Sequence, residues 1–181
     1  IREAKPPQVY IGSDGARATH FGEDKKVQAV RDYVLANIDW ECEIKVLFRK
    51  ENLGCKSAVE SAITWFFEHE EMGIILEDDC LPNSTFFEFC EELLERYRYD
   101  TRIMAISGDN FQYGKKQRTN YSYYFSRYPH CWGWATWKRA WSYYDTDMKL
   151  WPEIRDSGWL EDILDDFMEE NRDMSLERAS S

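Results

Sequence analysis

The stretch from Ile74 to Tyr97 reads IILEDDCLPNSTFFEFCEELLERY, and it carries the pattern that decides the fold. Its first three residues are apolar, as in a buried strand, and three acidic residues follow them without a break. Asn83 or Ser84 can cap the next segment, whose apolar residues recur at helical spacing. The stretch therefore predicts a strand, an acidic turn and an amphipathic helix.

The segments on either side continue this alternation. The predicted elements are, in order, a strand at 8–13, a helix at 24–38, a strand at 42–48, a helix at 57–70, a strand at 73–76, a helix after 84, strands at 103–107 and 121–125, a helix at 134–144 and an acidic helix after 159. Alternating strands and helices predict an α/β fold with a mainly parallel sheet flanked by helices. We see no repeat and no linker, so residues 1–181 are predicted to form a single domain.

Composition excludes several classes of protein. Apolar residues make up 43% of the 181 residues and charged ones 31%, which excludes intrinsic disorder. No apolar run approaches the roughly 18 residues of a transmembrane segment, and no export signal is visible, so we expect a soluble, cytoplasmic protein. The net charge of -11 argues against a nucleic-acid partner, because such proteins neutralise phosphates with their own cations.

Cysteine and aromatic content give weaker guidance. The five cysteines are odd in number and contain no C-x-x-C pair, so free buried thiols are favoured over disulfides or a zinc site. The chain holds 8 Trp, 11 Tyr and 10 Phe, many of them between residues 121 and 159. These rings could form a core, an interface or platforms for sugar rings, and composition does not choose among the three.

Polar residues follow three of the predicted strands, where ligands bind in parallel α/β sheets. They are Asp14, the segment Asn52 to Gly54, and the acidic triplet Glu77 to Asp79. About one acidic triplet is expected by chance in a chain this acidic, so only its position is informative. Adjacent carboxylates after a buried strand repel one another unless a cation lies among them, which predicts a Mg²⁺ or Mn²⁺ site.

Three segments together resemble one family. They are IILEDDCLPNSTFFEFCEELLERY (74–97), ENLGCKSAVESAI (51–63) and YFSRYPHCWGWATWKRAW (124–141). In this order they resemble glycosyltransferases of the GT-A fold, and most nearly the bacterial nucleotide-diphospho-sugar transferases related to N-acetylglucosaminyltransferase I. The resemblance extends from about residue 5 to residue 155. It implies a GT-A-like (Rossmann-like) fold with a mixed, mainly parallel sheet.

The same resemblance concerns the ends of the chain. Residues before Pro6 and Pro7 have the character of a truncated helix, and the first strand of the GT-A-like sheet has no counterpart. We therefore expect the domain to be incomplete at its N-terminus and beyond the C-terminal acidic helix.

The resemblance also implies roles for the acidic triplet. Asp79 would contact the metal ion, Mn²⁺ or Mg²⁺, while Asp78 would face the ribose or donor sugar and Glu77 would bond the sugar. Asp14 would accept a hydrogen bond from the imide N–H of the nucleotide base, although an Asx turn accounts for it nearly as well. A solvated strand end is the corresponding alternative for the triplet.

Further donor and acceptor contacts follow from the same alignment of motifs. Asn52 and Gly54 would support the donor pocket, with Gly54 allowing close backbone approach. Asp109 and Asn110 would contact the donor sugar. The segment Trp132, Gly133 and Trp134 would form the wall near the sugar and acceptor. Ordinary turns and packing aromatics are the competing interpretations.

The implied function is metal-dependent transfer of a sugar, of hexosyl or N-acetylhexosaminyl type, from a nucleotide-diphosphate donor to a hydroxyl acceptor such as a glycan. A UDP-sugar donor and inversion at the anomeric carbon are expected. The general base has no convincing match, and Asp145, Asp147 and Glu153 are candidates by location only. The alternative is a non-catalytic carbohydrate- or partner-binding domain derived from the same fold. The oligomeric state is left open.

Overall fold

The computed structural model describes residues 1–109 and 121–158 of the chain. The chain divides into two compact units, Ile1–Tyr144 and Asp145–Ser181, and each is described by itself. The single domain expected from the sequence stays a prediction. The described elements are β1 (Gln8–Ser13), α1 (Glu23–Ala36), β2 (Glu43–Phe48), α2 (Gly54–His69), β3 (Met72–Ile75), α3 (Thr85–Arg96), β4 (Ala105–Ser107), β5 (Trp134–Trp137), α4 (Lys138–Trp141) and, in the second unit, α5 (Trp151–Arg155). A mixed α/β fold is therefore confirmed. In the described ranges, no helix has the length and apolar character needed to cross a bilayer.

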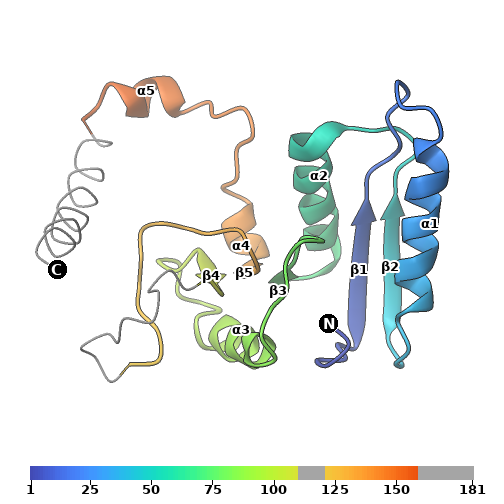
Figure 1. Cartoon of the computed structure of the whole chain (residues 1–181). Helices are drawn as coiled ribbons and strands as arrows, with labels where there is room; N and C mark the ends of the chain where they lie inside the picture. Colours follow the sequence, from blue (N-terminus) through green and yellow to red (C-terminus); the bar gives the residue numbers. More distant parts are fainter. Residues whose placement is uncertain (110–120, 159–181) are drawn as a thin grey trace, which may run out of the picture. The chain divides into compact units, whose positions relative to one another are not determined.

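The first sheet consists of β1 and β2, which run side by side in the same direction (Figure 1). Their register begins with Gln8 opposite Glu43. Helix α2 packs against β1, where the rings of Trp65 and Phe66 lie 5.3 and 4.9 Å from the ring of Tyr10. Edge-to-face contacts of this kind hold the helix over the strand.

The second sheet has the strand order β3-β5-β4, and β5 is antiparallel to both neighbours. The expected single, mainly parallel sheet is therefore replaced, among the described residues, by one parallel pair and one antiparallel sheet of three strands. The reason is the insertion of β5. Strands β3 and β4 run in the same direction, as expected, but β5 separates them and takes the hydrogen bonds of both.

Two predictions about the aromatic segment are wrong. Residues 134–137 form β5 and only Lys138–Trp141 is helical, because a short apolar run fits either period until a partner strand is known. Residues 121–125 form no strand. Instead Tyr123 packs against α3, and its hydroxyl lies 2.7 Å from that of Tyr97. The predicted acidic helix after residue 159 lies outside the described residues.

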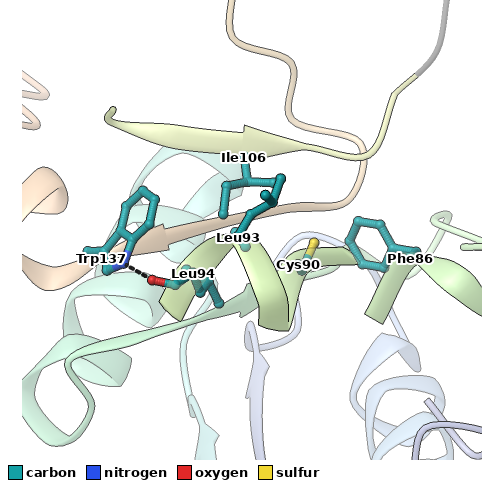
Figure 2. Close-up of a cluster of buried hydrophobic side chains, with 7 residues drawn as sticks. Phe86, Cys90, Leu93, Leu94, Ile106 and Trp137 are labelled. Carbon is teal, nitrogen blue, oxygen red and sulfur yellow. Dashed lines mark hydrogen bonds between the residues drawn. The ribbon is translucent and has the colours of Figure 1, made fainter. Parts of the chain in front are cut away.

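The core of the first unit lies between α3 and the second sheet. Phe86, Cys90, Leu93 and Leu94 form the buried stripe of α3, at the helical spacing that the sequence showed. Figure 2 shows this stripe facing side chains of β4 and β5. At the start of the helix, the Asn83 side chain accepts a hydrogen bond from the backbone N–H of Thr85 at 3.1 Å. Asn83 is thus the capping residue.

Helix α1 contributes much less to the core than its pattern indicates. Its apolar positions are spaced as in an amphipathic helix, yet none of its residues is buried, and the side chain of Val30 is 61% exposed. Helix α2 buries Ile63 and Phe67, whereas the sequence pattern predicts a buried stripe of Ala58, Ala62, Trp65 and Phe66.

All five cysteines are free, but the prediction that they are buried holds only for Cys90. Cys55 and Cys131 are exposed, and Cys42 and Cys80 are half-buried. Burial raises the pKa of the Cys90 thiol to about 12, so it stays protonated at neutral pH.

We expect iodoacetamide to modify Cys55 and Cys131 in the folded protein at least about tenfold faster than Cys90, since the thiolate is the reactive form. Peptide mass spectrometry over a time course measures the three rates. Unfolding in denaturant should make them similar. Fast labelling of Cys90 in the folded protein would contradict its place in the core.

Candidate functional site

The second sheet brings several predicted site residues to one edge. Trp134 is paired with Ile75 of β3 on one side and with Ser107 of β4 on the other. One residue further, Leu76 and Gly108 flank Gly133, and the Gly108 N–H donates to the Gly133 carbonyl at 3.0 Å. Since neighbouring strands lie about 4.8 Å apart, the two outer strands leave the sheet about 10 Å from each other.

Both outer strands are followed by acidic residues at this edge. Glu77 lies two residues beyond Ile75, and Asp109 lies two residues beyond Ser107, so they leave the sheet at equivalent positions. Gly133 adopts a left-handed φ of 81°, which a residue with a side chain rarely adopts. The region formed by residues 77–79, 109 and 132–134 is the end of the sheet at which β3 and β4 terminate and β5 begins. We call this end the acidic edge.

The acidic triplet itself is exposed at all three residues. Its chain turns back at once, with the Cys80 N–H donating to the Glu77 carbonyl at 3.1 Å. In residues 1–109 and 121–158, no three metal-ligating side chains are grouped closely enough to hold an ion. The argument that a cation must relieve repulsion in a dry setting therefore loses its basis, because water screens these charges.

Asp109 differs from the triplet because it is half-buried. The Asp109 carboxylate accepts a hydrogen bond from the Ser107 hydroxyl at 3.3 Å. The backbone N–H of Asp109 donates to the Ser107 hydroxyl oxygen at 3.2 Å. These bonds orient the side chain at the end of β4. Asn110, which the sequence predicts as a further sugar contact, lies outside the described residues.

The aromatic residues of the acidic edge point in different directions. Trp132 is 61% exposed, whereas Trp134 is half-buried with its ring 6.4 Å from that of Trp141. A shallow cavity of about 250 Å³ lies beside Trp134. Its lining includes Met104, Trp134, Thr136, Trp141, Tyr143 and Tyr144. Trp134 is therefore in part a packing residue, and Trp132 is the exposed ring of the predicted wall.

Asp14 lies at the carboxyl end of β1, in the other sheet, and its carboxylate is fully engaged. It accepts hydrogen bonds from the backbone N–H groups of Gly15, Leu53 and Gly54 and from the side-chain amide of Asn52, at 2.9 to 3.1 Å. Four donors fill the four acceptor positions of a carboxylate. Asp14 thus joins the end of β1 to the first turn of α2. To read a base it would have to give up one of these bonds.

Asn52 and Gly54 belong to the same network. Both amide hydrogen bonds of Asn52 are directed inward, to Asp14 and to the Gly15 carbonyl at 2.9 Å each. Gly54 has a φ of 76°, and a Cβ there would meet no atom within 4 Å. The left-handed backbone at the start of α2 is by itself a reason for glycine at this position, and the close approach of a donor to Gly54 stays a prediction.

Arg31 on α1 is a positioning residue that sequence reasoning missed. Its guanidinium donates to the backbone carbonyls of Ser13, Asp14 and Arg49, at 3.3, 2.9 and 2.7 Å, and lies 4.8 Å from the Phe48 ring centre. These bonds fix the ends of β1 and β2 together. The sequence holds no signal for this role, because an arginine on an amphipathic helix reads as solvent-facing.

The three candidates for a general base belong to the second unit and are described within it. Asp145 accepts backbone N–H bonds from Lys149 at 2.8 Å and from Asp147 at 3.0 Å. The Lys149 bond contributes most to lowering the pKa of Asp145, which makes it a weaker base. Asp147 and Glu153 are exposed.

Comparison with known proteins gives no match. None of the family models, the curated proteins or the solved structures that were compared with the chain matches it. The assignment of a function therefore depends on the residues and their geometry.

Proposed function

We propose that this chain is a metal-dependent glycosyltransferase that moves a sugar from a nucleotide-diphosphate donor, a UDP-sugar, to a hydroxyl acceptor with inversion. One observation carries the proposal. Glu77–Asp79 and Asp109 follow β3 and β4, which run in the same direction, and Trp132 precedes β5 at that same end of the sheet. Four carboxylates and one exposed aromatic ring therefore support the proposal.

The carboxylate oxygens of the acidic edge are suitable ligands for a hard cation. Carboxylate oxygens are preferred by Mg²⁺ and Mn²⁺, and such ions commonly use one or two protein carboxylates and take their other ligands from water and substrate phosphates. A site of that kind needs no group of three protein ligands. Asp79 would hold the ion, which would stabilise the negative charge of the departing nucleoside diphosphate.

The remaining residues of the edge would bind and orient the sugars. Asp78 and Glu77 are exposed and can accept hydrogen bonds from ribose and sugar hydroxyls, and Asp109 is held in place by Ser107. Trp132 presents an exposed ring to an acceptor, such as a glycan, that stacks a sugar face on it. A transferase of this kind would meet its donor in the cytoplasm, and its negative charge makes nucleic acid an unsuitable partner.

Replacing Asp79 with alanine should weaken UDP binding in the presence of Mn²⁺ by at least about tenfold, because a metal-binding carboxylate is lost. Titration calorimetry with UDP, with and without Mn²⁺, measures this. The control is Asp32→Ala, which removes an exposed carboxylate of α1 that bonds only Gln28 among the described residues.

Two results would contradict the transferase proposal. One is a wild-type chain that does not bind UDP with Mn²⁺, and the other is binding that Asp79→Ala leaves unchanged. Binding of a free glycan without nucleotide or metal, lost in Trp132→Ala, would instead favour a non-catalytic carbohydrate-binding domain.

A further inference from the structure

The outer edge of β2 has no paired strand within residues 1–109 and 121–158. Among the described residues, β2 pairs only with β1. The N–H groups of Glu43 and Arg49 donate toward β1, to the carbonyls of Pro7 and Ser13 at 2.8 and 3.0 Å. Since backbone groups alternate in direction along a strand, the N–H and C=O groups of the even-numbered residues 44, 46 and 48 point to the open side.

This edge is also apolar on one face. The side chains of Ile44 and Val46 are 38% and 45% exposed, and Phe48 follows them on the same face. Helix α1 lies beside β2 (Figure 1), and its Arg31 guanidinium lies 4.8 Å from the Phe48 ring centre. An exposed apolar edge strand readily pairs with another strand.

The Lys45 ammonium could prevent another strand from pairing with β2, but it lies on the opposite face of the sheet from Ile44 and Val46. The Lys45 ammonium donates to the Tyr10 hydroxyl at 2.7 Å and lies 3.6 Å from the Glu43 carboxylate. Tyr10 belongs to β1, so Lys45 is turned inward along the sheet. Edge strands of stable monomers usually carry an outward lysine or a proline, and β2 has neither device at its even-numbered positions.

We propose that β2 pairs with β2 of a second copy of this chain and that the two parallel pairs join into one continuous sheet. A two-fold axis makes the two β2 strands antiparallel. Three registers centred near the middle of the strand can be compared. The one centred on Lys45 sets two lysines directly opposite each other, which is unfavourable. The one centred on Ile44 extends to residues 41 and 42, which lie outside the strand.

The register centred on Val46 avoids both problems. It uses the whole of β2 and only one residue beyond it, Arg49, with Val46 opposite Val46 of the second copy and Ile44 opposite Phe48 of the second copy. At each end Glu43 lies opposite Arg49 of the second copy, so opposite charges face each other there, although within its own chain the Arg49 guanidinium bonds the Ser61 hydroxyl at 2.6 Å and the Glu43 carboxylate lies 3.6 Å from Lys45. The outward backbone groups of residues 44, 46 and 48 supply about six interstrand hydrogen bonds in this register. The pairing surface is small, so we expect a micromolar dimer.

Sedimentation velocity of the whole chain between about 1 and about 200 µM tests the proposal, because a weak dimer forms with concentration. We expect the sedimentation coefficient to rise from a monomer to a dimer value. Val46→Lys sets two ammonium groups opposite each other and should raise the dissociation constant at least about tenfold. Val59→Lys introduces the same charge at an exposed position of α2, the helix that packs against β1, and is the control.

Hydrogen exchange separates this pairing from any other dimer. The amides of Ile44 and Val46 should exchange more slowly at high than at low protein concentration, and only if β2 forms the interface. Circular dichroism of Val46→Lys checks that the variant is folded. A chain that remains monomeric at the highest concentration, or a dimer that Val46→Lys leaves intact, would overturn the proposal. Neither result depends on nucleotide or metal binding.

Discussion

Replacing Trp137 with alanine is expected to lower the free energy of unfolding of the first unit by about 3–5 kcal/mol, the largest loss among the changes considered. Trp137 is only 2% exposed and packs in the cluster between α3 and the second sheet (Figure 2). Its indole N–H donates to the Leu94 carbonyl at 3.0 Å, and the Arg139 guanidinium lies 4.3 Å from its ring centre. Alanine removes the packing, the hydrogen bond and the cation–π contact together.

Urea denaturation followed by circular dichroism measures this effect, and Trp137→Phe provides a graded variant if the alanine variant does not fold. Phenylalanine keeps most of the buried area but leaves the Leu94 carbonyl without its partner, so a loss of about 1–3 kcal/mol is expected. Trp132→Ala, at an exposed tryptophan, should change stability by less than about 1 kcal/mol. Equal effects at the two tryptophans would contradict the described core.

Replacing Asp14 with alanine is expected to lower the free energy of unfolding by about 2–3 kcal/mol, because the Asp14 carboxylate accepts hydrogen bonds at the N-terminus of α2. The change leaves the N–H groups of Leu53 and Gly54 at the helix N-terminus without a side-chain acceptor. It also removes one of the two hydrogen bonds of the Asn52 amide, and the bond to the Gly15 carbonyl remains. A negative charge at this end of a helix is favourable to the helix dipole, which adds to the loss.

Asp14→Asn separates the parts of this effect. The amide oxygen keeps some of the accepted bonds but not the charge, so a loss of about 1 kcal/mol is expected. Asp78→Ala removes an exposed carboxylate and should leave the free energy of unfolding within about 0.5 kcal/mol of the wild type. If Asp14→Ala were as stable as Asp78→Ala, the network around α2 would not be the role of Asp14.

The strands β1, β2 and β3 and the helices α1, α2 and α3 could be predicted to within about three residues, because each has a complete local pattern. The buried stripe of α3 was likewise visible in the spacing of Phe86, Cys90 and Leu93. The strand β5 could not be predicted. Trp134 and Trp137 fit the period of a helix as well as that of a strand, and only pairing with β3 and β4 distinguishes the two.

The candidate site was predicted in part. Glu77–Asp79, Asp109 and Trp132 were singled out from the sequence, and the structure places them at one edge. The engagement of Asp14 by α2 could not be predicted, because its partners Leu53 and Gly54 donate through backbone groups that no residue type reveals. The role of Arg31 depends on backbone carbonyls in the same way.

The sequence by itself determined the alternation of strands and helices and the acidic residues that follow β3, since both are local properties of residue type and spacing. The tertiary structure decided which strands pair, which apolar faces are covered and which carboxylates are engaged. These outcomes depend on hydrogen bonds and contacts between residues far apart in the chain. For the same reason the Asp14 carboxylate is filled with hydrogen bonds and Asp79 is exposed, although both are aspartates that follow a strand.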